Sequence, residues 1–444
     1  MADISTASTA GAADRSVAGL EPVAPNDAVW LQDSSANLMV INSVFTVDRM
    51  PAEVLRAVWS ERVMSEQSGR YARFRKRVLQ HDGRWWWQDV AEFDLSRHIF
   101  EVEEPLQTRE ALQRYIGEQA SKPLPADRPP WQMQVVPEFA GGESAIITRV
   151  HHVMGDGMAL MPVIFELMDL DGLTPDEVRE QQVKTHGTVG KPWQVALRAA
   201  LAAGPILVSQ ALRRADQTLF HGPELSGVKR VAWTPDLSLG RVKAIKNRQD
   251  ATVNDILLTI VSGAFLRYAR RHPDEHVERV RVSMPVDVRG RRHAAKLENR
   301  FGAVFVELPT GIEDVAERLA EIKRRMDALK RSIAPVVYYG AATAMLKLLP
   351  TQFSHRVLDF YASKCTAVLS NVPGPREALS IAGRTVRAML FWVPQRSNIG
   401  LGISILSFSG SVRVGVFADS AILEDPVDLV REIQAELEHV DAVL

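Results

Sequence analysis

The sequence predicts an α/β protein in which strands and helices interleave in both halves of the chain. Apolar runs of strand length alternate with segments whose apolar residues recur every three or four positions. Turn residues separate these segments, and nothing repeats at the period of a solenoid. The chain has 444 residues, 46% hydrophobic and 24% charged, a balance typical of a folded protein with room for two domains.

The first half begins with a strand and a helix, and a hairpin and a third helix follow a Pro-rich break at 123–131. The elements expected there are a strand at 34–47, a helix at 51–67, a strand with a turn at 84–100, a helix at 108–120, strands at 133–136 and 144–150, and a helix from about 160. We expect residues 1–18 to be a flexible tail and 19–180 to form one subdomain.

Residues 181–225 change character and are expected to form a helical connection, interrupted at Gly204-Pro205, to a second subdomain at 226–444. The elements expected in that subdomain are helices at 252–271 and 312–329, strands at 279–285, 303–308, 367–369, 388–392, 399–408 and 412–417, and a last helix capped by Asp425 with Pro426 at its first position.

Charge and cysteine content exclude several classes of function. The 53 Lys and Arg residues nearly balance the 54 Asp and Glu residues, so no basic field favours nucleic acid. Cys365 is the single cysteine, and no metal-binding spacing is present, which indicates a reducing, cytoplasmic location without a metal. The N-terminus lacks a secretory signal, and the longest uncharged run, 397–412, is too short to cross a bilayer.

Two histidines, His151 and His152, end the strand expected at 144–150 and precede Asp156 and Gly157. An imidazole exchanges protons near neutral pH, and a carboxylate four residues on is placed to fix its tautomer or to brace the turn. This spacing suits a general base. Alternatively, the histidines are only hydrogen-bonded residues at a strand end. The spacing alone leaves both interpretations open.

Three motifs together carry a family resemblance. Residues 151–157, His-His-Val-Met-Gly-Asp-Gly, fit the HHxxxDG signature of the CoA-dependent acyltransferase superfamily. Residues 370–375, Ser-Asn-Val-Pro-Gly-Pro, resemble the SNVPGP signature of bacterial wax ester synthase/diacylglycerol acyltransferases, and Asn254-Asp255 matches the ND motif of that family. The resemblance covers nearly all of the chain beyond the tail, including the stretches 26–27, 93–95, 299–302 and 425–426.

The resemblance implies two chloramphenicol-acetyltransferase-like subdomains with mixed sheets and an active-site tunnel passing His152 at their interface. It also implies acyl transfer without a covalent enzyme intermediate and with no cofactor besides acyl-CoA as substrate. His152 would accept the proton of the acceptor hydroxyl and then protonate the CoA sulfur. His151 would shape the channel. Asp156, next to Gly157, would brace the turn, paired with an arginine from Arg289, Arg291 or Arg292.

An oxyanion formed during transfer needs a hydrogen-bond donor. Asn254 is the first candidate, although Asn254 or Asp255 would equally serve to cap the helix that follows. Asn371 and Ser404 are further candidates for substrate binding. Pro373, Gly374 and Pro375 are expected to form a rigid crossing loop beside a segment that the two halves exchange.

The expected partners are acyl-CoA and a fatty alcohol or diacylglycerol, which implies contact with a membrane or a lipid droplet. Residues 192–214 and 336–349 are apolar and flanked by basic residues, as in helices that lie at an interface, and they would equally pack between the halves. Two other functions remain open: a condensation-type transferase that uses a carrier protein, and a lipid-binding protein of the same fold. Oligomeric state is left open.

Overall fold

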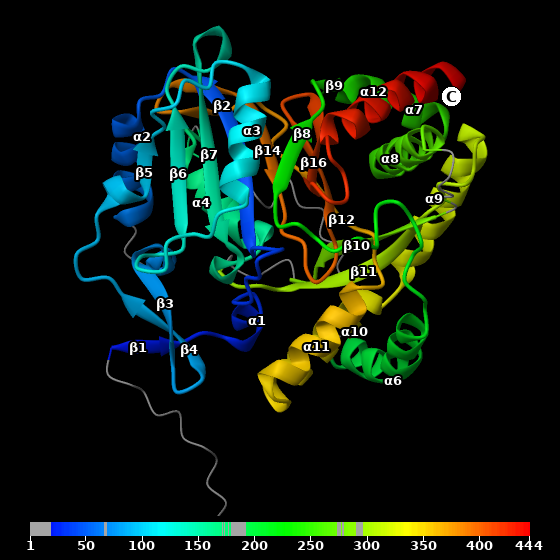
Figure 1. The fold of residues 1–444 in the computed structure, drawn as a ribbon, viewed down its shortest axis with the longest axis horizontal. Coiled ribbons are helices and arrows are strands. Elements are labelled where there is room, and N and C mark those ends of the chain that lie inside the picture. The colour runs from blue at the N-terminus through cyan, green and yellow to red at the C-terminus, as the bar shows by residue number, and fades with distance from the viewer. Residues whose placement is uncertain are drawn as a thin grey trace, which may run out of the picture.

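Two large sheets organise the computed structural model, which describes residues 19–65, 69–170, 172, 174–175, 177–178, 192–272, 277, 279–289 and 296–444. Within these ranges the strands form sheets of six, seven and three strands. Helices cover the faces of the two larger sheets (Figure 1). The arrangement confirms the mixed α/β fold expected from the alternation of strand and helix patterns. The expected tail at 1–18 lies outside the described residues.

The six-stranded sheet holds the hairpin that leads into the histidine motif. In spatial order its strands are β13 (Ser380–Ile381), β14 (Arg384–Trp392), β2 (Val40–Asp48), β7 (Glu143–His151), β6 (Trp131–Val136) and β5 (Ile99–Glu101). Strand β7 pairs antiparallel with β2 along its whole length, with His151 opposite Val40. The helices of this half are α1 (Pro25–Ala28), α2 (Ala52–Trp59), α3 (Arg109–Ala120) and α4 (Gly157–Leu167).

The seven-stranded sheet belongs to the second half of the chain. Its main path is β11 (Phe301–Leu308), β10 (Val280–Asp287), β12 (Ala367–Pro373), β15 (Leu401–Phe408), β16 (Ser411–Asp419) and β8 (Lys229–Trp233), and β9 (Leu237–Ser238) also pairs with β16. Helices α7 (Leu239–Arg248), α8 (Val253–Arg270), α9 (Val315–Arg331) and α12 (Pro426–Val443) cover one face and share its core. The small third sheet is β1 (Leu20–Pro22), β4 (Arg84–Asp89) and β3 (Lys76–His81).

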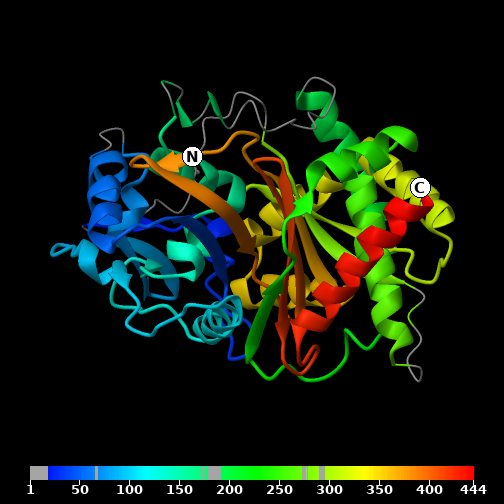
Figure 2. The ribbon, with the colours of Figure 1, turned by 90° about the horizontal axis from the view of Figure 1, so that it is seen from above.

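Two strands of the second half pair within the sheet of the first. Strand β14 runs antiparallel to β2, with Trp392 opposite Asn42 (Figure 2). The expected span 226–444 therefore does not form one subdomain in space, because residues 380–392 belong to the N-terminal sheet. This is the exchange of a segment between halves that the family resemblance implies.

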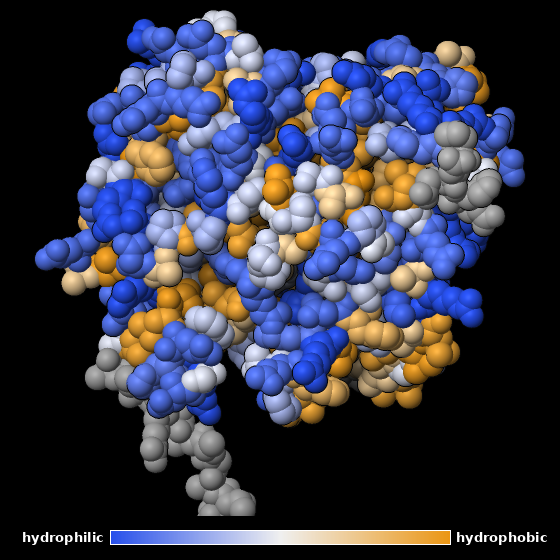
Figure 3. All heavy atoms as spheres, in the orientation of Figure 1, coloured by the Kyte–Doolittle hydropathy of each residue, from blue (hydrophilic) through white to orange (hydrophobic). Residues whose placement is uncertain are grey.

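Three helices form a separate layer at one end of the molecule: α6 (Pro192–Ala211), α10 (Ala334–Leu348) and α11 (Thr351–Ala362). The hydrophobic residues of this layer are visible at the lower right of Figure 3. The expected break at Gly204-Pro205 is wrong, because α6 continues through Pro205. Proline at this position removes the helical donor of the Leu201 carbonyl, and Leu201 is 75% exposed, so the interruption falls on a part of the helix that borders solvent.

Helix caps account for most of the other boundaries. Asp425 accepts a hydrogen bond from the Val427 amide and precedes Pro426, which confirms the expected start of the last helix. The helix expected from 312 begins instead at Val315, because the Asp314 carboxylate accepts from the Glu317 amide and caps it there. Among the described residues, none of the helices has both the length and the apolar composition needed to cross a bilayer.

Candidate active site

The histidine motif forms the turn between β7 and α4. His151 ends the strand, and its Nδ1 accepts a hydrogen bond from the Val153 amide at 3.1 Å. A 3-10 turn follows over His152–Met154. Gly155 then has φ = 154°, and a Cβ there would lie 3.1 Å from the Cβ of Ala159, so the position favours glycine. The motif is thus a fixed junction of strand and helix.

His152 is buried beneath aromatic rings. Its ring stacks on Trp30 with centroids 3.8 Å apart and planes 17° apart, and Phe301 lies 6.0 Å away. Its amide donates to the carbonyl of Met39 at 2.7 Å. Burial lowers the pKa of His152 to about 4, although the charge of Asp156 acts in the opposite direction. The imidazole is therefore neutral at pH 7 and able to accept a proton.

The two nitrogens of the His152 ring differ in their surroundings. Nδ1 is buried and has no hydrogen-bond partner, and Nε2 is not among the fully buried unpaired atoms of the described residues. Gly157, five residues on, is exposed, and a Cβ built there meets no atom within 4 Å. The start of α4 therefore borders open space beside the motif.

His151 is held by protein groups on both ring nitrogens. While Nδ1 accepts from Val153, Nε2 lies 3.4 Å from Oδ2 of Asp33. Burial alone would raise the pKa of Asp33, but its hydrogen bond and charge interaction with His151, together with a bond from the Met39 amide, lower it overall. These contacts make His151 a brace between the motif and residues 33–39.

Asp156 caps α4 and is tied to the second half of the chain. Oδ1 accepts from the Ala159 amide at 3.0 Å, and Oδ2 accepts from the Arg300 amide and from Nη2 of Arg289, both at 2.8 Å. The Arg289 and Asp156 side chains are only 1% and 7% exposed. The expected pairing with an arginine is confirmed for Arg289, whereas Arg291 and Arg292 lie outside the described residues. Both carboxylate oxygens have structural partners, as expected of a turn-bracing group.

A second clamp, not identified from the sequence, holds the other side of the motif. Both the amide and Nδ2 of Asn299 donate to Oδ1 of Asp27, at 2.8 and 2.9 Å, and Nδ2 also donates to the carbonyl of His152 at 2.8 Å. Arg73 pairs with Oδ2 of Asp27 at 2.8 Å and donates to the carbonyl of Met154 at 3.1 Å. The sequence held one signal for this clamp: the stretches 26–27 and 299–302, which belong to the family resemblance, contact each other here.

The two residues of the ND motif, Asn254 and Asp255, make different contacts. Asp255 and Thr252 form a capping box in which each side chain accepts from the other's amide, so the expected cap of α8 belongs to this pair. Oδ1 of Asn254 instead accepts from Nδ2 of Asn371 at 2.8 Å, which joins the ND and SNVPGP motifs. No hydrogen bond among the described residues links Asn254 or Asn371 to His152. The assignment of Asn254 as oxyanion donor stays a prediction.

Ser404 lies on the opposite face of the sheet from Asn371. Its register partner in β12 is Ser370, and side chains alternate between faces along a strand. The Oγ atom of Ser404 is buried without a hydrogen-bond partner. On the same face, Leu406 packs in the core of the N-terminal half. The structure therefore brings Asn254 and Asn371 together and separates them from Ser404.

The Pro-Gly-Pro segment carries the chain from one sheet toward the other. The amide of Gly374 donates to the carbonyl of Ser407 at 2.9 Å, and a Cβ at Gly374 would lie only 2.4 Å from that oxygen. The carbonyl of Pro375 accepts from the Ser409 amide. Residues 376–379 then lead to β13 of the N-terminal sheet. These contacts support the architectural role expected for Pro373, Gly374 and Pro375.

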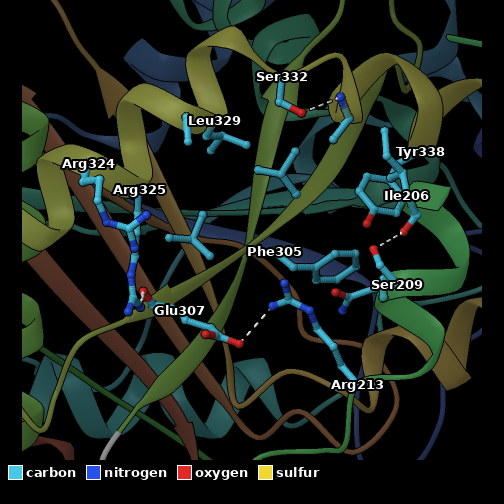
Figure 4. Close-up of a pocket in the computed structure, with 15 residues that line it drawn as sticks. Ile206, Ser209, Arg213, Phe305, Glu307, Arg324, Arg325, Leu329, Ser332 and Tyr338 are labelled. Carbon is cyan, nitrogen blue, oxygen red and sulfur yellow. Dashed lines mark hydrogen bonds and ion pairs between the residues drawn. The ribbon is translucent and has the colours of Figure 1, made fainter. Parts of the chain in front are cut away.

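Two cavities are described, and neither is lined by His151 or His152. The larger, of about 450 Å³, lies between α6, α9, α10 and β11 (Figure 4). The smaller, of about 240 Å³, lies beside α7 and α12. The tunnel expected to pass His152 therefore stays a prediction.

The single cysteine and the acidic residues do not suggest another reactive centre. Cys365 is buried, and burial raises the pKa of its thiol to about 12. Within the described ranges, no three His, Cys, Asp or Glu side chains are grouped so as to hold a metal ion. The histidine motif is thus the best-supported reactive site.

Comparison with known proteins assigns both halves of the chain to the family that the three sequence motifs resemble. A family model described as the wax ester synthase/diacylglycerol acyltransferase catalytic domain matches residues 23–220, and one described as the WS/DGAT C-terminal domain matches residues 297–441. A putative diacylglycerol O-acyltransferase of Mycobacterium tuberculosis is 27% identical over 375 residues, covering 76% of this chain and 73% of that protein. The O-acyltransferase WSD of Acinetobacter baylyi is 23% identical, with 81% and 83% covered.

Solved structures share the fold. The wax ester synthase/diacylglycerol acyltransferase from Marinobacter aquaeolei VT8 superposes with a TM-score of 0.68 at 18% identity, covering 95% of this chain and 99% of that one. The first condensation domain of the calcium-dependent antibiotic synthetase superposes with a TM-score of 0.60 at 14% identity, covering 96% of both.

Proposed function

Since the chain belongs to the wax ester synthase/diacylglycerol acyltransferase family and is an acyltransferase, we propose that it moves a long-chain acyl group from acyl-CoA to the hydroxyl of a fatty alcohol or a diacylglycerol. The observation that carries this proposal is His152: a buried, neutral imidazole whose backbone is clamped by residues from both halves of the chain. A neutral imidazole is the form that a general base requires.

The proposed reaction is one acyl transfer by addition and elimination at the thioester carbonyl, without a covalent enzyme intermediate. Nε2 of His152 takes the proton of the acceptor hydroxyl while that oxygen attacks the thioester carbonyl. The tetrahedral intermediate collapses, the carbon–sulfur bond breaks, and the imidazolium returns the proton to the CoA thiolate. The products are an ester and CoA with a free thiol, and His152 ends neutral. We assign the proton to Nε2 because Nδ1 is enclosed by protein atoms.

The protein groups around His152 act by positioning. Trp30 stacks on the ring and limits its rotation, and the Asn299 amide holds the His152 carbonyl. Asp156 fixes the turn through Arg289 instead of bonding to the imidazole. We propose Nδ2 of Asn254 as the oxyanion donor, because its Oδ1 is already engaged by Asn371 and the amide orientation is thereby set.

The acceptor is an apolar lipid in this proposal, so the enzyme must meet a lipid phase. We propose that it does so from the cytoplasm as a peripheral protein at the inner membrane or at lipid droplets. The names of the relatives favour an ester of diacylglycerol or of a long-chain alcohol. The condensation-domain fold keeps a carrier-protein donor as the second candidate.

The test is acceptor-dependent release of CoA thiol by the purified chain, with palmitoyl-CoA as donor and hexadecanol or dioleoylglycerol as acceptor. Release that requires an acceptor, yields the matching ester and disappears in His152→Ala at unchanged melting temperature supports the proposal. Release only from palmitoyl-carrier protein would transfer the assignment to the condensation type. No turnover with either donor would contradict catalysis of this kind.

A further inference from the structure

Large hydrophobic side chains are exposed mainly on one layer of helices. Among the described residues, ten such side chains are exposed, and eight belong to α6, α10, α11 and the residues that directly follow α6 and α10. These eight are Leu197, Leu201, Val208, Leu212, Leu348, Leu349, Phe353 and Phe360, with exposed fractions from 43% to 79%. We call the surface they form the α6–α10–α11 face. It appears as an orange region at the lower right of Figure 3. Clustering of this kind marks an interaction surface.

Helix α6 turns an apolar stripe outward. At about 100° per residue, Leu197, Leu201, Val208 and Leu212 fall within about 60° of one another around the helix axis. The residues that line the larger cavity, Ile206, Ser209, Gln210 and Arg213, lie on the opposite side (Figure 4). A surface helix normally turns polar residues to water and buries its apolar side. In and directly after helix α6, Leu201 and Leu212 are instead 75% and 78% exposed, so nothing in the described part of the chain covers its apolar side.

Helix α11 places aromatic and basic side chains on one side. Phe353 and Phe360 are seven residues apart and so share a side, and Arg356 lies one turn from each. The ammonium of Lys364 lies 4.3 Å from the centre of the Phe360 ring. The acidic residue of this helix, Asp359, is paired with Arg396 at 2.7 Å. Aromatic rings beside cations are typical of helices that lie in a lipid headgroup region.

The charge of this layer opposes that of the chain as a whole. Residues 192–214 and 334–365 contain six Lys or Arg residues and one Asp, whereas the whole chain has a net charge of −1. Arg198, Arg214, Lys347 and Arg356 have no acidic partner within the described part of the chain. A positive, apolar face on an otherwise negative protein is complementary to a surface that is apolar and anionic.

The three helices form one unit. Helix α10 packs against both α6 and α11, and the hydroxyl of Tyr361 in α11 donates to the carbonyl of Leu207 in α6. The inner side of α10 meets the active-site region: Nδ2 of Asn26 contacts Tyr339 and Thr343 at 3.1 Å, next to the Asp27 clamp. The face is thus one helix away from the elements that hold His152.

From these observations we infer that the α6–α10–α11 face docks on an anionic lipid surface, with Leu197, Leu201, Val208, Leu212, Phe353 and Phe360 inserted among the acyl chains and the basic side chains at the headgroups. The inference rests on the proposed function, because an enzyme with a lipid acceptor has to reach a lipid surface. Binding of this face to a lipid surface can nevertheless be measured without turnover.

The experiment measures binding of the full chain to vesicles by co-sedimentation, and each variant has a matched control elsewhere. The apolar variant Leu201→Ser/Leu212→Ser is compared with Val228→Ser/Val443→Ser, whose side chains are 50% and 51% exposed on other parts of the surface. The charge variant Arg198→Ser/Arg356→Ser is compared with Arg84→Ser/Lys243→Ser. Vesicles are pure phosphatidylcholine or an equal mixture with phosphatidylglycerol, at low and high salt.

We expect strong binding to the anionic vesicles only. Partitioning should fall about 100-fold or more in the apolar variant and about 30-fold in the charge variant, while both control variants bind like wild type. High salt should weaken the binding of wild type, because screening shortens the range of the headgroup potential to about 3 Å at 1 M. Unchanged binding of either face variant, or equal binding to both vesicle types, would overturn the inference.

Two further readouts separate this inference from its alternatives. Thiol release with a water-soluble short-chain alcohol should be the same in wild type and all four variants, because the face is not part of the reaction site. Vesicle binding without any turnover would contradict the proposed function and support the docking face. Turnover without vesicle binding would support the proposed function and overturn the docking face. A wild-type dimer in light scattering that Leu201→Ser/Leu212→Ser converts to monomer would identify a second copy of the chain as the occupant and overturn lipid docking.

Discussion

Removing the Asp156 carboxylate tests whether this residue is a structural brace. Its ion pair with Arg289 is 2.8 Å long and almost fully buried. Losing one partner of such a pair costs about 3–5 kcal/mol, and losing a helix N-cap costs about 1 kcal/mol. Asp287, at 3.1 Å from Arg289, keeps part of the arginine's charge compensated, so we place the cost of Asp156→Ala at about 4 kcal/mol. With an unfolding entropy of about 2.1 cal/mol/K per residue, the melting temperature falls by about 4 °C.

The assay is a double-mutant cycle of thermal unfolding with Asp156→Ala, Arg289→Met and the double variant. Because the second substitution removes the uncompensated charge that the first leaves behind, the double variant should be more stable than the sum of the single effects by at least about 2 kcal/mol. An exposed pair is the control: Glu438→Ala, which breaks a bond to Arg241, should cost at most about 1 kcal/mol.

A catalytic role for Asp156 would give a different pattern. If the two single effects add, the buried pair is not coupled and the brace interpretation is wrong. If Asp156→Asn, which keeps the oxygen that caps α4, loses kcat by more than about 100-fold at an unchanged melting temperature, the carboxylate takes part in the reaction. A shift of the acidic limb of the pH–rate profile alone reflects its charge, which already acts against the lowering of the His152 pKa by burial.

Three other properties follow from the site. The pKa of His152 is about 4 in the folded chain and about 6.5 in the unfolded chain, so the unfolded chain binds the proton first as the pH falls. The free energy of unfolding should therefore decrease by about 3 kcal/mol between about pH 6.5 and pH 4, measured in urea titrations as the difference between wild type and His152→Ala. Equal pH dependence of the two proteins would contradict this prediction. Trp30→Ala should lower kcat about fivefold, because it removes ring stacking worth about 1 kcal/mol. Trp85→Ala is the control, and an unaffected kcat in Trp30→Ala would be the contrary result. Asn254→Ala should lower kcat by about 100 to 1,000-fold with little change in melting temperature if its amide holds the oxyanion, and a purely structural role would instead appear as lost stability.

Local patterns predicted elements well where the determinants are close in sequence. Alternating apolar residues gave the hairpin of β6 and β7, and the Asp425-Pro426 pair gave the start of α12. The helix α6 shows the limit of such signals: Gly204-Pro205 is a strong helix breaker by composition, but α6 continues through it at an exposed position. Helix α7 was missed because its apolar residues are sparse. Helix α11 was also missed, although its apolar residues recur with helical spacing at Phe353, Val357 and Phe360.

Long-range pairing explains most of what the sequence did not reveal about the site. Nothing near 384–392 indicates that this strand joins β2, some 340 residues earlier in the chain. The clamp of Asp27, Arg73 and Asn299 likewise depends on contacts between distant segments, and each residue alone reads as an ordinary polar surface residue. The histidine motif was recognisable because its residues are adjacent, and the role of Asp255 because a capping box is local.

The central claim is that His152 moves the proton in acyl transfer and that its neighbour does not. The most direct measurement is kcat for His152→Gln and His151→Gln at saturating palmitoyl-CoA and acceptor, with melting temperatures recorded for both. The account predicts that His152→Gln loses about 100 to 10,000-fold in kcat at nearly unchanged stability, while His151→Gln loses stability through its contact with Asp33 and retains most of kcat in the folded fraction. A His152→Gln enzyme that keeps wild-type kcat, or equal catalytic losses in both variants, would contradict it.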